Sequence, residues 1–86
     1  MNEAEALKWY YKAAEQGVAE AQFILGLDYK RGEGGVKKDF AKGAEWYRKA
    51  AEQGHMYALY NLAVCYEYGE GVPKDKETAI KLYQKA

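Results

Sequence analysis

The stretch WYYKAAEQG, Trp9–Gly17, occurs a second time as WYRKAAEQG, Trp46–Gly54, at an offset of 46 − 9 = 37 residues. A second element, Ala-x-x-x-Leu-Gly/Ala-x-x-Tyr-x-x-Gly-x-Gly, starts at Ala21 and again at Ala58, so its offset is 58 − 21 = 37 residues. Periods of about 20–50 residues are typical of chains built from stacked supersecondary units. The sequence therefore predicts a repeat architecture and not one irregular globule.

A glycine-rich segment, GEGGVKKD at Gly32–Asp39, follows the second element and returns one residue shorter as GEGVPKD at Gly69–Asp75. The period falls there to 75 − 39 = 36, which places the extra residue at Gly34 or Gly35. Glycines followed by a lysine can hold phosphate, but that loop needs a preceding strand and Gly-Lys-Ser/Thr. Here a helix is expected to precede, no Ser or Thr follows within reach, and the equivalent loop contains Pro73. We interpret both segments as turns between helices.

The segment 39–53 has apolar residues at helical spacing on one face and charged residues on the other. Asp39 and Asp75 stand where an N-cap is expected, and Gly17 and Gly54 follow the AAEQ segments as helix-ending glycines. We call this helix type B. The side chains predicted to face inward from this segment are Phe40, Gly43, Ala44, Trp46, Tyr47, Ala50 and Ala51.

The other helix type, which we call A, covers about 19–31 and 56–68 and is apolar on nearly every side. Such a helix lies between neighbours, and Gly26 and Ala63 at matching positions allow close approach. The expected fold is all-α, an α/α solenoid of antiparallel pairs in a right-handed stack, forming a single domain over 1–86. Its five helices, in the order B-A-B-A-B, are expected at about 2–16, 19–31, 39–53, 55–68 and 75–86.

The Leu-Gly-x-x-Tyr-x-x-Gly-x-Gly element, the following Val-x-Lys-Asp and the Trp-Tyr-x-Lys-Ala-Ala-Glu-Gln-Gly segment together closely resemble the Sel-1-like repeat family. Tetratricopeptide repeats share Leu-Gly-x-x-Tyr but have a shorter period, about 34 residues. The resemblance implies an adaptor or scaffold that holds protein partners without catalysis. Gly43 stands where the family usually has alanine, and Asp28 where it tends to be apolar. The paired cysteines of secreted members are missing.

Composition limits the other function classes. Thirteen basic and thirteen acidic residues cancel, so no global field favours nucleic acid or an anionic membrane. No apolar run approaches the roughly 18 residues that span a bilayer, and the N-terminus does not resemble a signal peptide. Cys65 is the only cysteine, which suits a reducing, cytoplasmic compartment, although the chain can belong to a longer protein. In KWYYK, Trp9 and Tyr10 repeat on the inward face, which favours core packing over base stacking.

We expect no catalytic, metal or cofactor site. The chain has no serine, and its only histidine, His55, lies ten residues from Cys65 on one predicted helix. That separation is about 15 Å at the helical rise, which is too far for a catalytic pair. Two such residues are also too few for a metal site.

A protein or peptide partner is expected in a groove lined by the A helices. Tyr and Arg are favoured at interfaces. The partner-binding candidates are Phe23, Leu27, Arg31, Tyr57, Tyr60, Asn61, Val64 and Tyr68. Asp28 is either a further groove residue or a partly exposed polar substitution.

The alternative is a truncated or engineered repeat fragment that mainly self-associates. Solenoids usually need three or more units with polar caps, and the first B helix here has no preceding A helix to cover it. The candidate self-association residues on that helix are Leu7, Trp9 and Tyr10.

Overall fold

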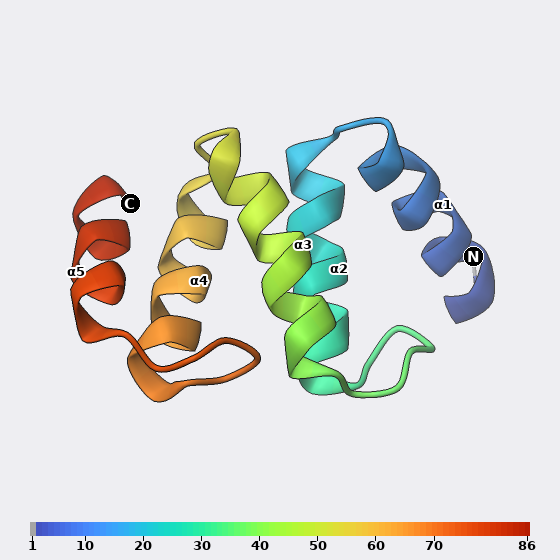
Figure 1. Ribbon diagram of the computed structural model, residues 1–86. Helices are drawn as coiled ribbons and strands as arrows, with labels where there is room; N and C mark the ends of the chain where they lie inside the picture. Colours follow the sequence, from blue (N-terminus) through green and yellow to red (C-terminus); the bar gives the residue numbers. More distant parts are fainter. Residues whose placement is uncertain (1) are drawn as a thin grey trace.

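The computed structural model describes residues 2–86, which form five α-helices and no strand. They are α1 (Glu3–Glu15), α2 (Ala19–Arg31), α3 (Phe40–Glu52), α4 (Met56–Tyr68) and α5 (Lys76–Lys85). Each helix packs chiefly on its neighbours in the chain, so the helices follow one another in an elongated row of 40 × 23 × 15 Å (Figure 1). The predicted all-α solenoid is confirmed.

Local sequence signals set the helix ends. The side chains of Asn2, Asp39 and Asp75 each accept a hydrogen bond from the backbone N–H three residues later, as N-caps do. The two A helices, α2 and α4, end at Gly32 and Gly69, each left-handed with φ near +69°. Because a side chain disfavours this conformation, glycine at these two positions defines where the turn begins.

The core is centred on Tyr47 of α3, which is completely buried against Ala44, Leu62 and Cys65. A Cβ added to Gly26 of α2 would lie 2.5 Å from the Tyr47 ring. A Cβ added to Gly43 would lie 3.0 Å from the Gly26 carbonyl oxygen. The departure from alanine at Gly43 therefore has a structural reason, because the α2 and α3 backbones meet there.

Each A-to-B turn reaches back toward the preceding B helix (Figure 1). Gly34 and its counterpart Gly71 both have positive φ, +68° and +75°, and Gly35 adds a third left-handed residue at +89°. A Cβ on Gly71 would meet the Phe40 carbonyl, and one on Gly34 would meet the Asp28 carboxylate. The interpretation of the glycine-rich segment as a turn between two helices is confirmed, and Gly35 is the additional residue of the first turn. Asp28 lies half-buried against this turn.

Candidate functional site

The two A helices begin side by side and are tied together there. His55 is the N-cap of α4: its Nδ1 accepts the Ala58 backbone N–H at 3.1 Å. The other ring nitrogen lies 2.9 Å from a carboxylate oxygen of Glu20, in the first turn of α2. A candidate surface that includes both A helices therefore has a fixed geometry at this end.

Phe23 joins the two A helices one turn further along. Its ring lies 4.8 Å from the His55 ring and 6.1 Å from the Tyr57 ring, centroid to centroid, and it also contacts Tyr47 at 6.0 Å. Phe23 is half-buried, so one side of it belongs to the core and the other to the surface. Its position makes α2 and α4 parts of one aromatic surface.

Three tyrosines of α4 are largely exposed: Tyr57 at 70%, Tyr60 at 54% and Tyr68 at 66%. Tyr60 meets Tyr83 of α5 edge-on at 5.4 Å. The Tyr83 hydroxyl donates a 2.6 Å hydrogen bond to Glu67, and this bond, followed by partial burial, raises the pKa of Tyr83. The hydrogen bond to Glu67 holds the Tyr83 ring in place against Tyr60.

The remaining partner-binding candidates differ in how accessible they are. Leu27 is half-buried and packs on the Tyr47 cluster, and Val64 is half-buried as well. Asn61 donates its side-chain amide to the Tyr57 carbonyl at 2.7 Å, which holds it along the helix surface. Arg31 is exposed at the end of α2. The accessible aromatic area therefore comes mainly from the tyrosines of α4.

A shallow apolar hollow of about 360 Å³ lies beside these tyrosines, lined by Met56, Tyr57, Tyr60 and Ala86. Met56, 65% exposed, and Tyr83 were not among the residues predicted from the sequence. Tyr83 aligns with Tyr47, which favoured an inward position, and Met56 aligns with Ala19, so the repeat pattern placed neither residue on this surface. The tyrosines of α4, which were already among the predicted partner-binding residues, are the sequence signal that points to this end.

The self-association candidates are placed differently from one another. Leu7 and Tyr10 are half-buried and pack on Ala14, Ala21 and Leu25. Trp9, in contrast, is 62% exposed. The prediction that Trp9 packs in the core was wrong, whereas its counterpart Trp46 does pack on Ala14 of α1 and on Ala21 and Leu25 of α2.

Cys65 is buried in the core, and burial raises the pKa of its thiol. Its environment is that of an inert structural cysteine. Among residues 2–86, no group of three or more His, Cys, Asp or Glu side chains is arranged to hold a metal ion. Within the same range, no helix combines the length and apolar character that crossing a membrane requires.

The Sel1 repeat family model matches this chain in three segments, residues 2–18, 19–55 and 57–86. Among curated proteins, none matches significantly. The solved Sel1 repeat protein from Oxalobacter formigenes is 44% identical, with a TM-score of 0.90; the match covers 94% of this chain and 33% of that one.

Two further solved structures have the same fold. The protein c5321, a protective antigen of uropathogenic Escherichia coli with an SLR fold, is 41% identical with a TM-score of 0.91 over 95% of this chain and 17% of its own. Helicobacter pylori cysteine rich protein B is 29% identical with a TM-score of 0.94, over 99% of this chain and 63% of its own. This chain thus spans less than two thirds of each of these structures. Family model, sequence identity and fold agree, and the chain belongs to the Sel1 repeat family.

Proposed function

We propose that this chain is a non-catalytic protein-interaction module that binds a protein or peptide partner through the surface formed by α2 and α4. Sel1 repeats generally serve as protein–protein interaction modules. The observation that carries the proposal is the row of exposed tyrosines on α4, Tyr57, Tyr60 and Tyr68. Large exposed aromatic side chains are the residue type that supplies most of the energy at interfaces.

The proposed surface extends from Tyr68 and Arg31 at one end to Tyr57 and Phe23 at the other. Phe23, stacked with Tyr57, provides continuity between the two helices. Tyrosine suits such a surface because it loses little conformational entropy on binding and offers both an apolar ring and a hydroxyl. The hollow beside Tyr57 and Tyr60 would take an apolar side chain of the partner.

Affinity capture with Tyr57→Ala and Tyr60→Ala variants tests the proposal. Each variant should lower the recovery of a specifically captured partner by about tenfold, the loss expected for an interface hot spot. The melting temperature should change by only a few degrees, because both side chains are mostly exposed. Trp9→Ala, which removes an exposed aromatic residue elsewhere, is the matched control and should bind normally. Unchanged capture by both tyrosine variants would contradict the proposal.

Self-association is the second candidate, and the exposure of Trp9 favours it. The equivalent Trp46 packs on Ala14, Ala21 and Leu25, whereas Trp9 is 62% exposed. An exposed indole next to the half-buried Leu7 and Tyr10 is a surface that a second molecule would cover. Light scattering across a concentration series should then show association that Trp9→Ala abolishes. A strict monomer at high concentration would refute it.

A further inference from the structure

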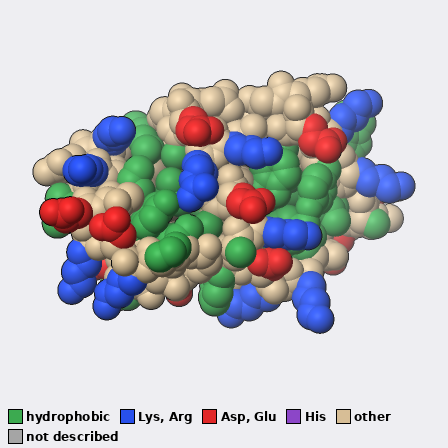
Figure 2. Space-filling view, in the orientation of Figure 1, with side chains coloured by type: hydrophobic (Ala, Val, Ile, Leu, Met, Phe, Trp, Pro, Cys, Tyr) green, Lys and Arg blue, Asp and Glu red, His purple; other side chains and the backbone are tan. Residues whose placement is uncertain are grey.

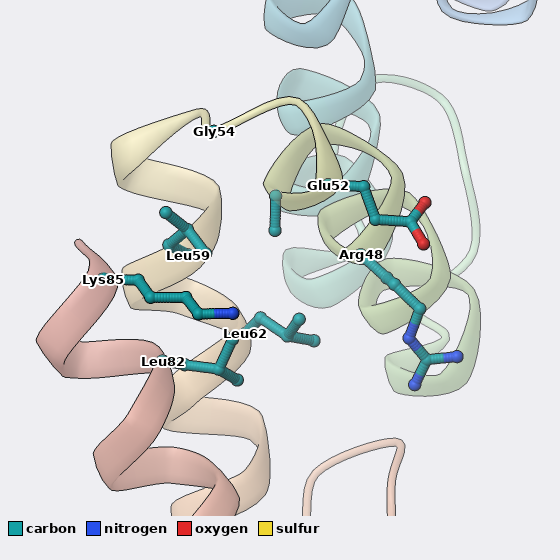
Figure 3. Close-up of a pocket in the computed structure, with 8 residues that line it drawn as sticks. Arg48, Glu52, Gly54, Leu59, Leu62, Leu82 and Lys85 are labelled. Carbon is teal, nitrogen blue, oxygen red and sulfur yellow. The ribbon is translucent and has the colours of Figure 1, made fainter.

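A groove of about 430 Å³ lies between the B helices α3 and α5, formed by residues other than the exposed tyrosines of α4 (Figure 3). Its floor is three leucines, Leu59 and Leu62 from α4 and Leu82 from α5. Figure 2, in the orientation of Figure 1, shows apolar side chains over α4, between α5 and α3, with charged side chains at their edges. We call this feature the α3–α5 groove.

The same place in the preceding repeat, between α1 and α3, is filled. The Trp46 indole packs there on Ala14, Ala21 and Leu25, and the Tyr11 ring meets it edge-on at 5.8 Å. Above the indole, the Lys49 ammonium lies 4.8 Å from the ring centroid. The fold thus contains one complete example of what this type of groove accommodates: an indole on an apolar floor under a lysine.

The α3–α5 groove is open because two aromatic residues are replaced at equivalent positions. Offsets of 37 and 36 residues align Arg48 with Tyr11 and Leu82 with Trp46. Both changes remove a ring. The apolar floor remains, and the lysine remains as well, since Lys85 aligns with Lys49. The groove therefore keeps the apolar floor and the lysine that surround the Trp46 indole, but it contains no indole.

The charged residues around the groove favour a negatively charged occupant. Lys85 extends from α5 over the leucines toward α3 in Figure 3, whereas the side chains of Arg48 and Glu52 on α3 both point away from them. Arg48 donates one hydrogen bond of 3.0 Å to the Tyr66 hydroxyl, and its guanidinium has further N–H donors. The charged residues that line the groove are two cations, Arg48 and Lys85, and one carboxylate, Glu52, so its edge carries a net positive charge.

We propose that the α3–α5 groove binds a tryptophan side chain of an acidic peptide segment from a partner protein. The indole would lie on Leu59, Leu62 and Leu82 with the Lys85 ammonium over its face. A neighbouring Asp or Glu of the peptide would pair with Arg48 or Lys85. Trp9 of a second copy fits less well, because its charged neighbours Glu5, Lys8 and Lys12 together would bring a net positive charge to a positive edge.

Methyl NMR with a short peptide of sequence type Asp-Trp-Asp tests this site directly. Adding the peptide should shift the methyl signals of Leu59, Leu62 and Leu82, and a peptide with alanine in place of tryptophan should not. Leu82→Trp should fill the groove from within, as Trp46 does, and weaken peptide binding at least about tenfold. Tyr60→Ala should bind the peptide normally, so that failure here is distinguishable from failure of the α2–α4 surface.

A charge variant keeps the proposal testable if Leu82→Trp does not fold. Lys85→Glu should weaken binding about two- to fivefold and reduce its dependence on salt concentration, as expected for loss of an exposed ion pair. Lys81→Glu, the same charge change on α5 outside the groove, is the matched control and should bind normally. Wild-type affinity in both groove variants would overturn the proposal. So would leucine shifts that appear on raising the protein concentration alone and vanish in Trp9→Ala, since they would assign the groove to a second copy.

Discussion

His55 and Glu20, 35 residues apart in the sequence, form a 2.9 Å contact that joins the start of α4 to the first turn of α2. The His55 Nδ1 accepts the Ala58 N–H, so the proton of the neutral ring sits on Nε2 and is donated to Glu20. The imidazole thus satisfies a backbone donor of its own helix and links the two A helices. The His55 side chain is only 13% exposed, so its bond to the Ala58 N–H is partly shielded from water, whereas the Glu20 side chain is 68% exposed.

Replacing His55 with alanine removes the cap and the link together. We expect His55→Ala to lower the free energy of unfolding by about 1–2 kcal/mol, measured by urea denaturation, as for the loss of a helix N-cap. Glu20→Ala removes only the more exposed partner and should cost less than about 1 kcal/mol. His55→Asn retains a capping side chain and should recover most of the loss. Equal costs for His55→Ala and Glu20→Ala would show that the cap contributes nothing.

The helix N-caps show which features of this fold the sequence patterns could predict and which they could not. Asp39 and Asp75 were predictable, because aspartate at the end of a turn before an apolar-periodic segment is a common helix start. His55 was not, since histidine is not a preferred capping residue and its role depends on the direction of one ring. Its contact with Glu20 further requires that α2 and α4 start side by side, which is a property of the stacked fold.

The Asp28 carboxyl makes the stability of the folded protein depend on pH. Partial burial, followed by repulsion from Glu33, raises the pKa of Asp28 in the folded protein above its unfolded value near 3.8. The folded state therefore binds this proton more tightly than the unfolded state, so the charged form opposes folding at neutral pH. This cost disappears as the pH falls through the folded pKa toward the unfolded one.

We therefore expect Asp28→Asn to be more stable than the wild type at pH 7, and equally stable at pH 3, where both states are protonated. Solvent screening at this half-buried site limits the gain to less than about 1 kcal/mol. Urea denaturation at both pH values measures the difference. A variant that is less stable at pH 7 would show that the carboxylate makes a stabilising interaction with the turn at Gly34.

The two A-to-B turns predict opposite outcomes for two glycine changes. Deleting Gly35 should leave the fold intact, because the second turn lacks this residue and the added one lies next to exposed Glu3 and half-buried Leu7. Gly71→Ala should instead cost at least about 2 kcal/mol, since the new methyl group would meet the Phe40 carbonyl at a left-handed φ of +75°. Circular dichroism and thermal melting of both variants test this. An unfolded deletion variant would mean that the turns are not interchangeable.

Trp9 and Trp46 mark the limit of prediction from the repeat pattern. The 37-residue period assigns them the same place in a unit, although the helices around them differ. Burial, however, also depends on the neighbouring unit: Trp46 packs against α1 and α2, whereas Trp9 on α1 is 62% exposed. The α3–α5 groove was not predicted either. It arises because Arg48 and Leu82 stand where the preceding repeat has the rings of Tyr11 and Trp46.

Tyr47 provides the last prediction. Its ring is completely buried, and its hydroxyl has no hydrogen-bond partner among residues 2–86. Burial raises the pKa of this hydroxyl, which stays neutral at all ordinary pH values. A buried, unpaired hydroxyl costs free energy, while the ring itself fills the core beside Gly26. Tyr47→Phe should therefore raise the free energy of unfolding by up to about 1 kcal/mol.

Tyr29→Phe is the matched control for Tyr47→Phe, because the Tyr29 hydroxyl is hydrogen-bonded to the Tyr11 hydroxyl. Removing it leaves a part-buried partner unsatisfied and should lower the free energy of unfolding by about 1 kcal/mol. The same chemical change thus has opposite signs at two buried tyrosines of neighbouring helices, and paired urea titrations measure both. A Tyr47→Phe variant that is as destabilised as Tyr29→Phe would show that a water molecule bonds the Tyr47 hydroxyl in solution.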